Sequence, residues 1–141
     1  MEAFLKVEES ALGRRWVGPG AEVDRMAEAM EQVITHEIGH AIDLPHNMVA
    51  SSAYPTDSLR SQTFSSQMGV APTIMDYARQ NYIAQPEDGL RPEDFLRRIG
   101  PYDLYSVNWG YRILPDAATP DDERDTLDAW IVERAEDRFA D

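Results

Sequence analysis

All three histidines of this chain fall within one stretch of eleven residues, and this stretch limits what the chain can fold into. His36 and His40 enclose the pattern H-E-x-x-H, and His46 follows six residues later. On a helix, residues four apart lie one turn above each other on the same face, so His36 and His40 can present two imidazoles to one point. The stretch therefore predicts a helix that carries two ligands, followed by a turn that brings His46 back to them.

Three neutral imidazoles suit a catalytic zinc ion, which commonly takes three protein ligands and leaves its fourth position to water. Glu37 then lies beside the open position, where a carboxylate can take a proton from that water. The alternative is a helix with partly solvated histidines. It leaves unexplained why every imidazole of the 141 residues stands at ligand spacing in one window.

The sequence around the histidines favours a helix from Glu22 to about Asp43, since acidic side chains suit a helix N-terminus. At about 100° per residue, its apolar residues form one stripe, and Glu37 falls inside that stripe. The stripe consists of Val23, Met26, Met30, Val33, Ile34 and Ala41. A buried carboxylate costs free energy, which a nearby dication would offset. Pro45 disfavours helical geometry at Leu44, so we expect it to end the helix.

The rest of the chain is predicted to be mainly α-helical with long ordered loops. Residues 1–20 look like a loop with one strand or helix end at Phe4–Glu8, and residues 47–74 look like a long loop with a helical turn around Asp57–Arg60. Further helices are expected over 92–99, from Pro101 to about Tyr111, and from Pro120 to about Phe139 with Thr119 as N-cap. In the last of these, one face carries Leu127, Trp130, Ile131 and Ala135.

Composition narrows the range of functions. The net charge is −13, so we expect no nucleic-acid partner. Ten of the acidic side chains lie in residues 116–141, where a solvated helix face explains them better than a calcium loop does. There is no cysteine for a disulfide or a thiolate zinc site, and neither a transmembrane segment nor a signal peptide is visible.

Five further segments resemble one known family. They are His46-Asn47-Met48, Ala50–Pro55, Asp57–Ser61, Ile74–Arg79 and Asn108–Tyr111. Together with the histidine pattern, they resemble the metzincin zinc peptidases, whose signature is H-E-x-x-H-x-x-G-x-x-H with a later Met-turn. The similarity is to the catalytic segment of large exported bacterial zinc-dependent metalloproteases of that clan, and it covers residues 21–112.

The resemblance implies a site. His36, His40 and His46 would bind Zn²⁺, and Glu37 would be the general base and acid. Met75 would form the apolar floor beneath the metal in the Met-turn. Tyr77 matches a position that in some metzincins reaches the zinc or stabilises the oxyanion.

The chain departs from the family in two ways. Asp43 stands where the signature has Gly, and Asp is among the residues that best tolerate the left-handed backbone of that turn. Only about twenty residues precede the helix, too few for the sheet of a full α+β metzincin domain. Either the chain is a fragment of a longer protease or the missing strands come from elsewhere, and we expect residues 1–141 to form a single unit, a fragment of a catalytic domain. Its parts would be a lead-in (1–20), the active-site helix with the third ligand (21–46), loops with the Met-turn (47–91) and C-terminal helices (92–141).

The leading hypothesis is a zinc-dependent endopeptidase acting on a peptide or protein substrate. A zinc-binding but inactive structural or binding module, derived from such a protease, is the first alternative. A helical interaction domain without metal is the second, and it leaves the histidine clustering unexplained. An exported location follows from the resemblance alone.

Overall fold

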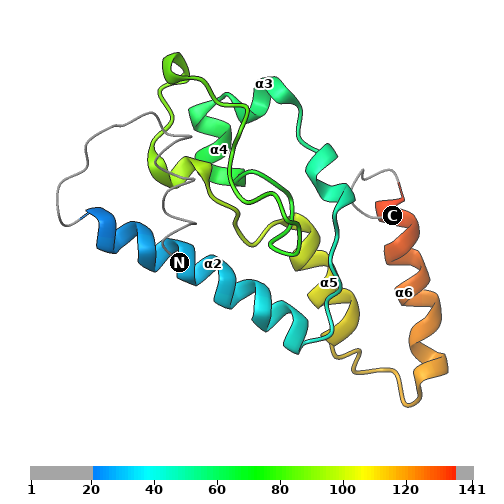
Figure 1. Ribbon diagram of the computed structural model, residues 1–141. Helices are drawn as coiled ribbons and strands as arrows, with labels where there is room; N and C mark the ends of the chain where they lie inside the picture. Colours follow the sequence, from blue (N-terminus) through cyan, green and yellow to red (C-terminus); the bar gives the residue numbers. More distant parts are fainter. Residues whose placement is uncertain (1–20, 136–141) are drawn as a thin grey trace.

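The computed structural model describes residues 21–135, and these residues form helices joined by long ordered loops (Figure 1). In chain order the α-helices and 3-10 helices (η) are α2 (Ala21–Ala41), η1 (Val49–Ser52), α3 (Thr56–Leu59), α4 (Gln62–Met68), η2 (Pro86–Asp88), η3 (Pro92–Phe95), α5 (Pro101–Tyr111) and α6 (Pro120–Arg134). No strand occurs within the described residues, so the mainly helical prediction is confirmed. The predicted segment Phe4–Glu8 and the final turn of the last predicted helix lie outside them.

Helix α2 ends at a left-handed residue and not at the proline. Asp43 has φ 62°, and its backbone N–H donates to His40 O at 3.0 Å. Leu44 N–H donates to Gly39 O, also at 3.0 Å. This pair of bonds is a Schellman motif, which satisfies carbonyls that the end of a helix leaves free. Asp43 therefore ends the helix, and Pro45, which we expected to do so, only follows the turn.

The predicted apolar stripe of α2 is not its buried face. Met30 and Val33 are 50% exposed and Ile34 is 53% exposed, whereas the buried positions are Gln32, His36 and Gly39. Glu37 is also exposed, so the prediction that it is buried and needs a nearby dication is wrong. The reason is that the chain after α4 packs against the histidine side of the helix.

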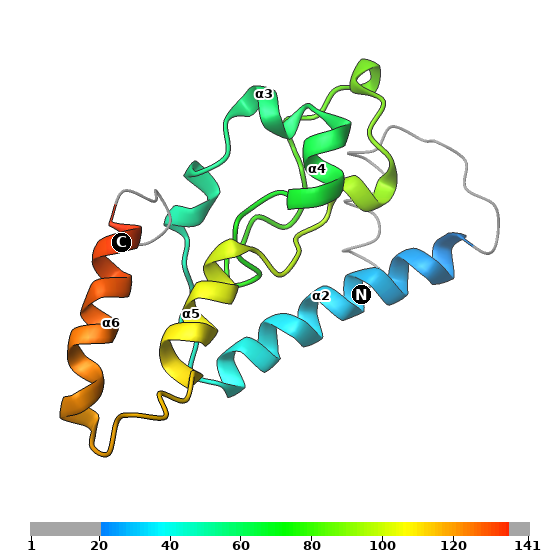
Figure 2. The same ribbon diagram turned by 180° about the vertical axis from the view of Figure 1, so that it is seen from behind.

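That packing segment runs from Gly69 to Asp76 and forms the centre of the molecule, beside α2 and the first turn of α5 (Figures 1 and 2). Its buried side chains include Val70, Ala71, Thr73, Ile74, Met75 and Asp76. Backbone bonds tie it to its neighbours, from Asn47 N–H to Met75 O at 3.2 Å and from Tyr102 N–H to Pro72 O at 3.1 Å. A segment without regular structure is thus the most buried part of the described chain.

Residues 47–74 contain more helix than predicted. The turn around Asp57–Arg60 is present as α3, but α4 was not expected, because residues 47–74 as a whole show no clear apolar periodicity. Its only sequence signals are the ends: Ser61 Oγ accepts from Phe64 N–H at 3.4 Å, and Gly69 follows with φ 67°. The helix predicted over 92–99 is shorter, since η3 ends at Phe95.

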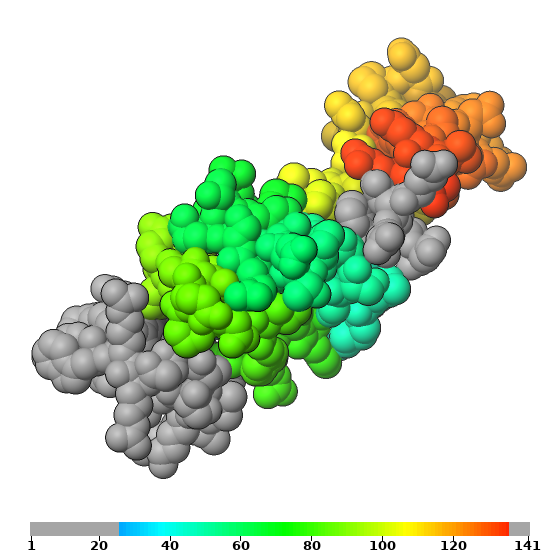
Figure 3. Space-filling model, turned by 90° about the horizontal axis from the view of Figure 1, so that it is seen from above, coloured from blue at the N-terminus to red at the C-terminus, as the bar shows by residue number. Residues whose placement is uncertain are grey.

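Helices α5 and α6 begin where predicted, at Pro101 and Pro120. The Tyr111 hydroxyl donates to Ile42 O at 2.8 Å and joins the end of α5 to the end of α2. Figure 3 shows α6 at one end of the described residues. On its predicted apolar face, Ile131 stays 46% exposed, and no residue of α6 is buried. No helix of the described residues is long and apolar enough to cross a membrane.

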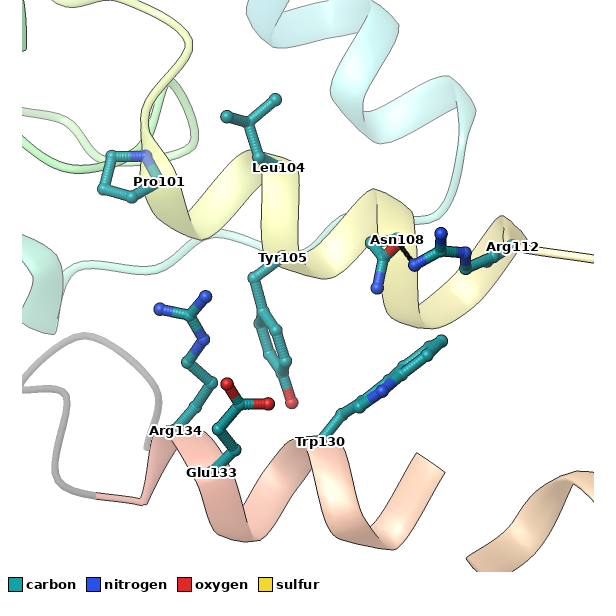
Figure 4. A pocket seen from close by; sticks show the side chains of 8 residues that line it. All are labelled: Pro101, Leu104, Tyr105, Asn108, Arg112, Trp130, Glu133 and Arg134. Carbon is teal, nitrogen blue, oxygen red and sulfur yellow. Dashed lines mark hydrogen bonds between the residues drawn. The ribbon is translucent and has the colours of Figure 1, made fainter. Parts of the chain in front are cut away.

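A cleft of about 430 Å³ separates α5 from α6 (Figure 4). It is lined by Pro101, Leu104, Tyr105, Asn108, Arg112, Trp130, Glu133 and Arg134. Inside it, the Arg112 guanidinium lies 5.8 Å from the centre of the Trp130 ring, a cation–π contact. None of the three histidines lines this cleft, so it is separate from the site that the sequence predicts.

Candidate metal centre

The structure brings the three histidines together. Nε2 of His46 lies 3.1 Å from Nε2 of His36 and 2.9 Å from Nε2 of His40. One ligand atom from each residue lies within 4.8 Å of the others. Two zinc ligands at tetrahedral angles and normal Zn–N lengths are about 3.3 Å apart, so these nitrogens converge at nearly the spacing that zinc requires.

Backbone carbonyls fix the tautomer of two of the rings. His36 Nδ1–H donates to Ile74 O at 2.8 Å, and His40 Nδ1–H donates to Leu44 O at 2.9 Å. A carbonyl oxygen only accepts, so the proton of each neutral ring lies on Nδ1 and the lone pair on Nε2. Both lone pairs therefore face His46. Such outer hydrogen bonds are typical of histidines that bind metals. The donor set fits a zinc ion.

The carbonyl of Leu44 reaches His40 because of the turn at Asp43. The predicted left-handed backbone of Asp43 is confirmed by its φ of 62°. The same turn directs the chain through Pro45 to His46. Asp43 thus adopts the left-handed backbone for which the metzincin signature has Gly. The three imidazoles converge although the residue differs.

Met75 lies beneath the histidine helix. Its side chain is fully buried and packs against Gly39, where an added Cβ would lie only 2.3 Å from the sulfur. Glycine is therefore required on this turn of α2, between the two histidines, for the sulfur to approach the backbone. The position agrees with the apolar floor predicted for Met75, and that role stays a prediction.

Two predicted catalytic side chains are exposed and lie near the cluster. Tyr77 is 56% exposed, and its ring centre is 4.4 Å from that of His46 and 5.7 Å from that of His36. Glu37 is exposed on the helix turn between His36 and His40. Their catalytic roles stay predictions.

The electrostatics of His46 reflect this crowding. Its pKa is lowered, first because packing against its neighbours removes water from the ring, and then because His40 and His36 lie close enough to disfavour a positive charge on it. The carboxylate of Glu37 acts in the opposite direction and raises the pKa. The lowered pKa favours the neutral form of His46, which is the form that binds a metal.

Sequence reasoning missed the residues that hold the loop under the histidines. Asp103 accepts from Ile74 N–H at 2.8 Å and from Gly100 N–H at 2.7 Å. Arg97 Nη1 donates to Ile74 O at 3.1 Å. The one available signal was Asp103 two residues after Pro101, a position where a carboxylate caps a helix. No local pattern around Arg97 indicates its hydrogen bond to Ile74 O.

An H-E-x-x-H helix is the mark of the zincins, and a third histidine together with a buried methionine near that helix is typical of their metzincin branch. The sequence profile of a family described as Met-zincin matches residues 20–140. The chain belongs to this Met-zincin family. Comparison with curated proteins and with solved structures gives no match.

Proposed function

We propose that this protein is a zinc-dependent endopeptidase. The observation that carries the proposal is the convergence of three imidazole nitrogens, two with their lone pairs fixed by carbonyls, beside the exposed Glu37. His36, His40 and His46 would hold the ion. A zinc ion bound there supplies a Lewis acid that acidifies water and polarises the scissile carbonyl.

Three side chains around the cluster would then have separate roles in the reaction. The carboxylate of Glu37 takes the proton of the attacking water and passes it to the nitrogen of the leaving amine. The hydroxyl of Tyr77 donates a hydrogen bond to the oxygen that becomes negatively charged. Met75 keeps the underside of the site dry and apolar. The substrate is an extended peptide or protein segment.

The first test is the metal content of protein purified without added metal or a histidine tag. We expect about one zinc per chain, because three fixed neutral imidazoles match the ligand set of a catalytic site. His46→Ala should weaken zinc binding, because it removes one of the three ligands. Absence of zinc from the unaltered protein, even after reconstitution near neutral pH, would refute the metal site.

The second test is hydrolysis of unstructured protein and of fluorogenic peptides by the zinc-loaded protein. Glu37→Gln should abolish cleavage and keep the metal, because it removes the proton acceptor and leaves the imidazoles intact. Glu31→Gln on the same helix is the matched control and should cleave normally. Turnover retained in Glu37→Gln would refute the assignment of Glu37. Bound zinc without hydrolysis by the unaltered protein would instead select the inactive zinc-binding module.

A further inference from the structure

The backbone of Ile74 is held at both of its polar atoms by charged side chains. Asp103 Oδ2 accepts from Ile74 N–H at 2.8 Å. Arg97 Nη1 donates to Ile74 O at 3.1 Å, and the same oxygen accepts from His36 Nδ1–H at 2.8 Å. Hydrogen bonds to charged groups are about twice as strong as neutral ones, so this short piece of chain is held firmly.

Asp103 joins this piece of chain to helix α5. Its carboxylate also accepts from Gly100 N–H at 2.7 Å, at the start of α5, and from the hydroxyl of Thr73. Thr73 Oγ1 in turn accepts from Met75 N–H at 2.9 Å. The side chain is only 4% exposed, yet its oxygens have donors from three residues. One carboxylate therefore fixes the loop that carries Ile74 and Met75 relative to α5.

Arg97 joins the same loop to helix α2. Its backbone N–H donates to Oε1 of Gln32, one turn before His36. Its guanidinium donates to the carbonyl of Asp76 as well as to that of Ile74. Burial lowers the pKa of Arg97, and within the described residues its buried Nε has no hydrogen-bond partner. Burying a cation costs free energy. In this protein the buried guanidinium fixes the positions of two carbonyls next to the histidine cluster, those of Ile74 and Asp76.

We propose that Asp103 and Arg97 are positioning residues of the metal centre, which clamp the backbone of Ile74 so that its carbonyl holds the His36 imidazole with Nε2 toward His40 and His46. This inference rests on the metal site of the proposed function. Neither side chain is one of the three proposed ligands. Both act through Ile74 O, whose position decides the orientation and tautomer of His36.

The rival explanation is that Asp103 is an ordinary buried helix cap, and Asp94 provides the comparison. Asp94 is fully buried, and its Oδ2 accepts from Arg91 N–H at 2.9 Å, just as Asp103 accepts from Gly100. Its other partners are the side chains of Arg91 and Gln62. Asp94→Asn thus removes a buried cap carboxylate without touching Ile74, and it is the matched control for Asp103→Asn.

The test measures zinc affinity by competition with a chromophoric chelator, together with the proton NMR signal of His36 Nδ1–H. Asp103→Asn should weaken zinc binding about 10- to 100-fold and shift or broaden that signal, because partners of metal-bound histidines have effects of this size. Asp94→Asn should change the affinity less than about 2-fold at a comparable loss of stability. Equal effects of the two variants, or no effect of Asp103→Asn, would overturn the proposal.

A second pair of variants keeps the test decisive if Asp103→Asn does not fold. Arg97→Gln should weaken zinc binding and alter the His36 signal, Arg97→Lys should restore part of both, and Arg91→Gln should change neither, because Arg91 pairs with Asp94 and Glu93. These readouts do not depend on peptide hydrolysis. If the unaltered protein bound no zinc, the proposed function would fail, and the His36 Nδ1–H signal of the metal-free protein would still decide whether the clamp exists.

Discussion

Asp43 shows how one residue can decide whether the third histidine reaches the others. Its φ of 62° is the only positive value at a non-glycine residue within the described part of the chain. Left-handed backbone costs most residues about 1–2 kcal/mol, and Asp less. Asp43→Ala should therefore lower the free energy of unfolding by about 1 kcal/mol, whereas Asp43→Gly should not lower it. Urea unfolding of the metal-free protein measures both.

The control for Asp43 is Asp116→Ala, since Asp116 is also exposed and lies in a turn but has no left-handed backbone. Its unfolding free energy should change by less than about 0.5 kcal/mol, as for ordinary surface positions. A loss at Asp116 as large as that at Asp43 would mean that negative charge, and not backbone geometry, is what matters at Asp43.

At the level of elements, the contact of α2 with the Met75 loop depends on Gly39. Alanine in a helix interior is better than glycine by about 1 kcal/mol. At Gly39 that gain is opposed, because the new Cβ would lie 2.3 Å from the sulfur of the fully buried Met75. Overpacking of a core typically costs about 1–3 kcal/mol. We expect Gly39→Ala to destabilise the protein and to weaken zinc binding, measured by denaturant unfolding and chelator competition.

Gly110 on α5 gives the matched comparison, because a Cβ added there would meet nothing within 4 Å. Gly110→Ala should leave zinc affinity unchanged. The unfolding free energy of this variant should be about 2 kcal/mol higher than that of Gly39→Ala. Adding Met75→Ala to Gly39→Ala should cost less than the sum of the two single changes, since the smaller side chain relieves the overlap. Strict additivity would show that the two residues do not compete for space.

The same elements show what could be predicted from the sequence. Helices α5 and α6 were placed because proline and cap residues mark a helix start locally. The histidine cluster was placed because ligand spacing on a helix is also local. The buried face of α2 could not be predicted in this way. Its apolar periodicity indicated that Val33 and Ile34 would be buried, but both are half-exposed, because the loop from Gly69 to Asp76 packs on the other side of the helix. That loop is held by Asp103 and Arg97, and partners this distant leave no periodic signal.

For the whole molecule, acid stability depends on carboxylates that hold the long loops together. The Arg60 guanidinium donates to both oxygens of Asp88, at 2.9 Å and 2.8 Å, across the gap between α3 and η2. These bonds, with the Gln85 N–H, hold the pKa of Asp88 below its ordinary value of 3.8. For Asp94, burial alone would raise the pKa, but hydrogen bonds from Arg91 and Gln62 outweigh it and the net shift is downward.

These shifts fix the pH range in which stability is lost. A carboxylate with a lowered folded pKa stabilises fully above its unfolded pKa, here 3.8, and that contribution disappears as the pH falls through the folded pKa. The pKa of His46 is also lowered, so its contribution to stability is likewise lost on acidification. That loss begins as the pH falls below its ordinary pKa of 6.5. The metal-free protein should therefore lose stability in two steps on acidification, the first due to His46 and the second to Asp88 and Asp94.

Arg60→Gln separates the two steps. It removes the main cause of the lowered pKa of Asp88, so it should flatten the loss of stability below about pH 4 and leave the loss below about pH 6.5 unchanged. His46→Ala should do the reverse. Urea unfolding of the metal-free variants at neutral, mildly acidic and strongly acidic pH measures both. An acid limb in Arg60→Gln as steep as in the parent protein would mean that the loops around α3 and η2 are held by packing, and not by this ion pair.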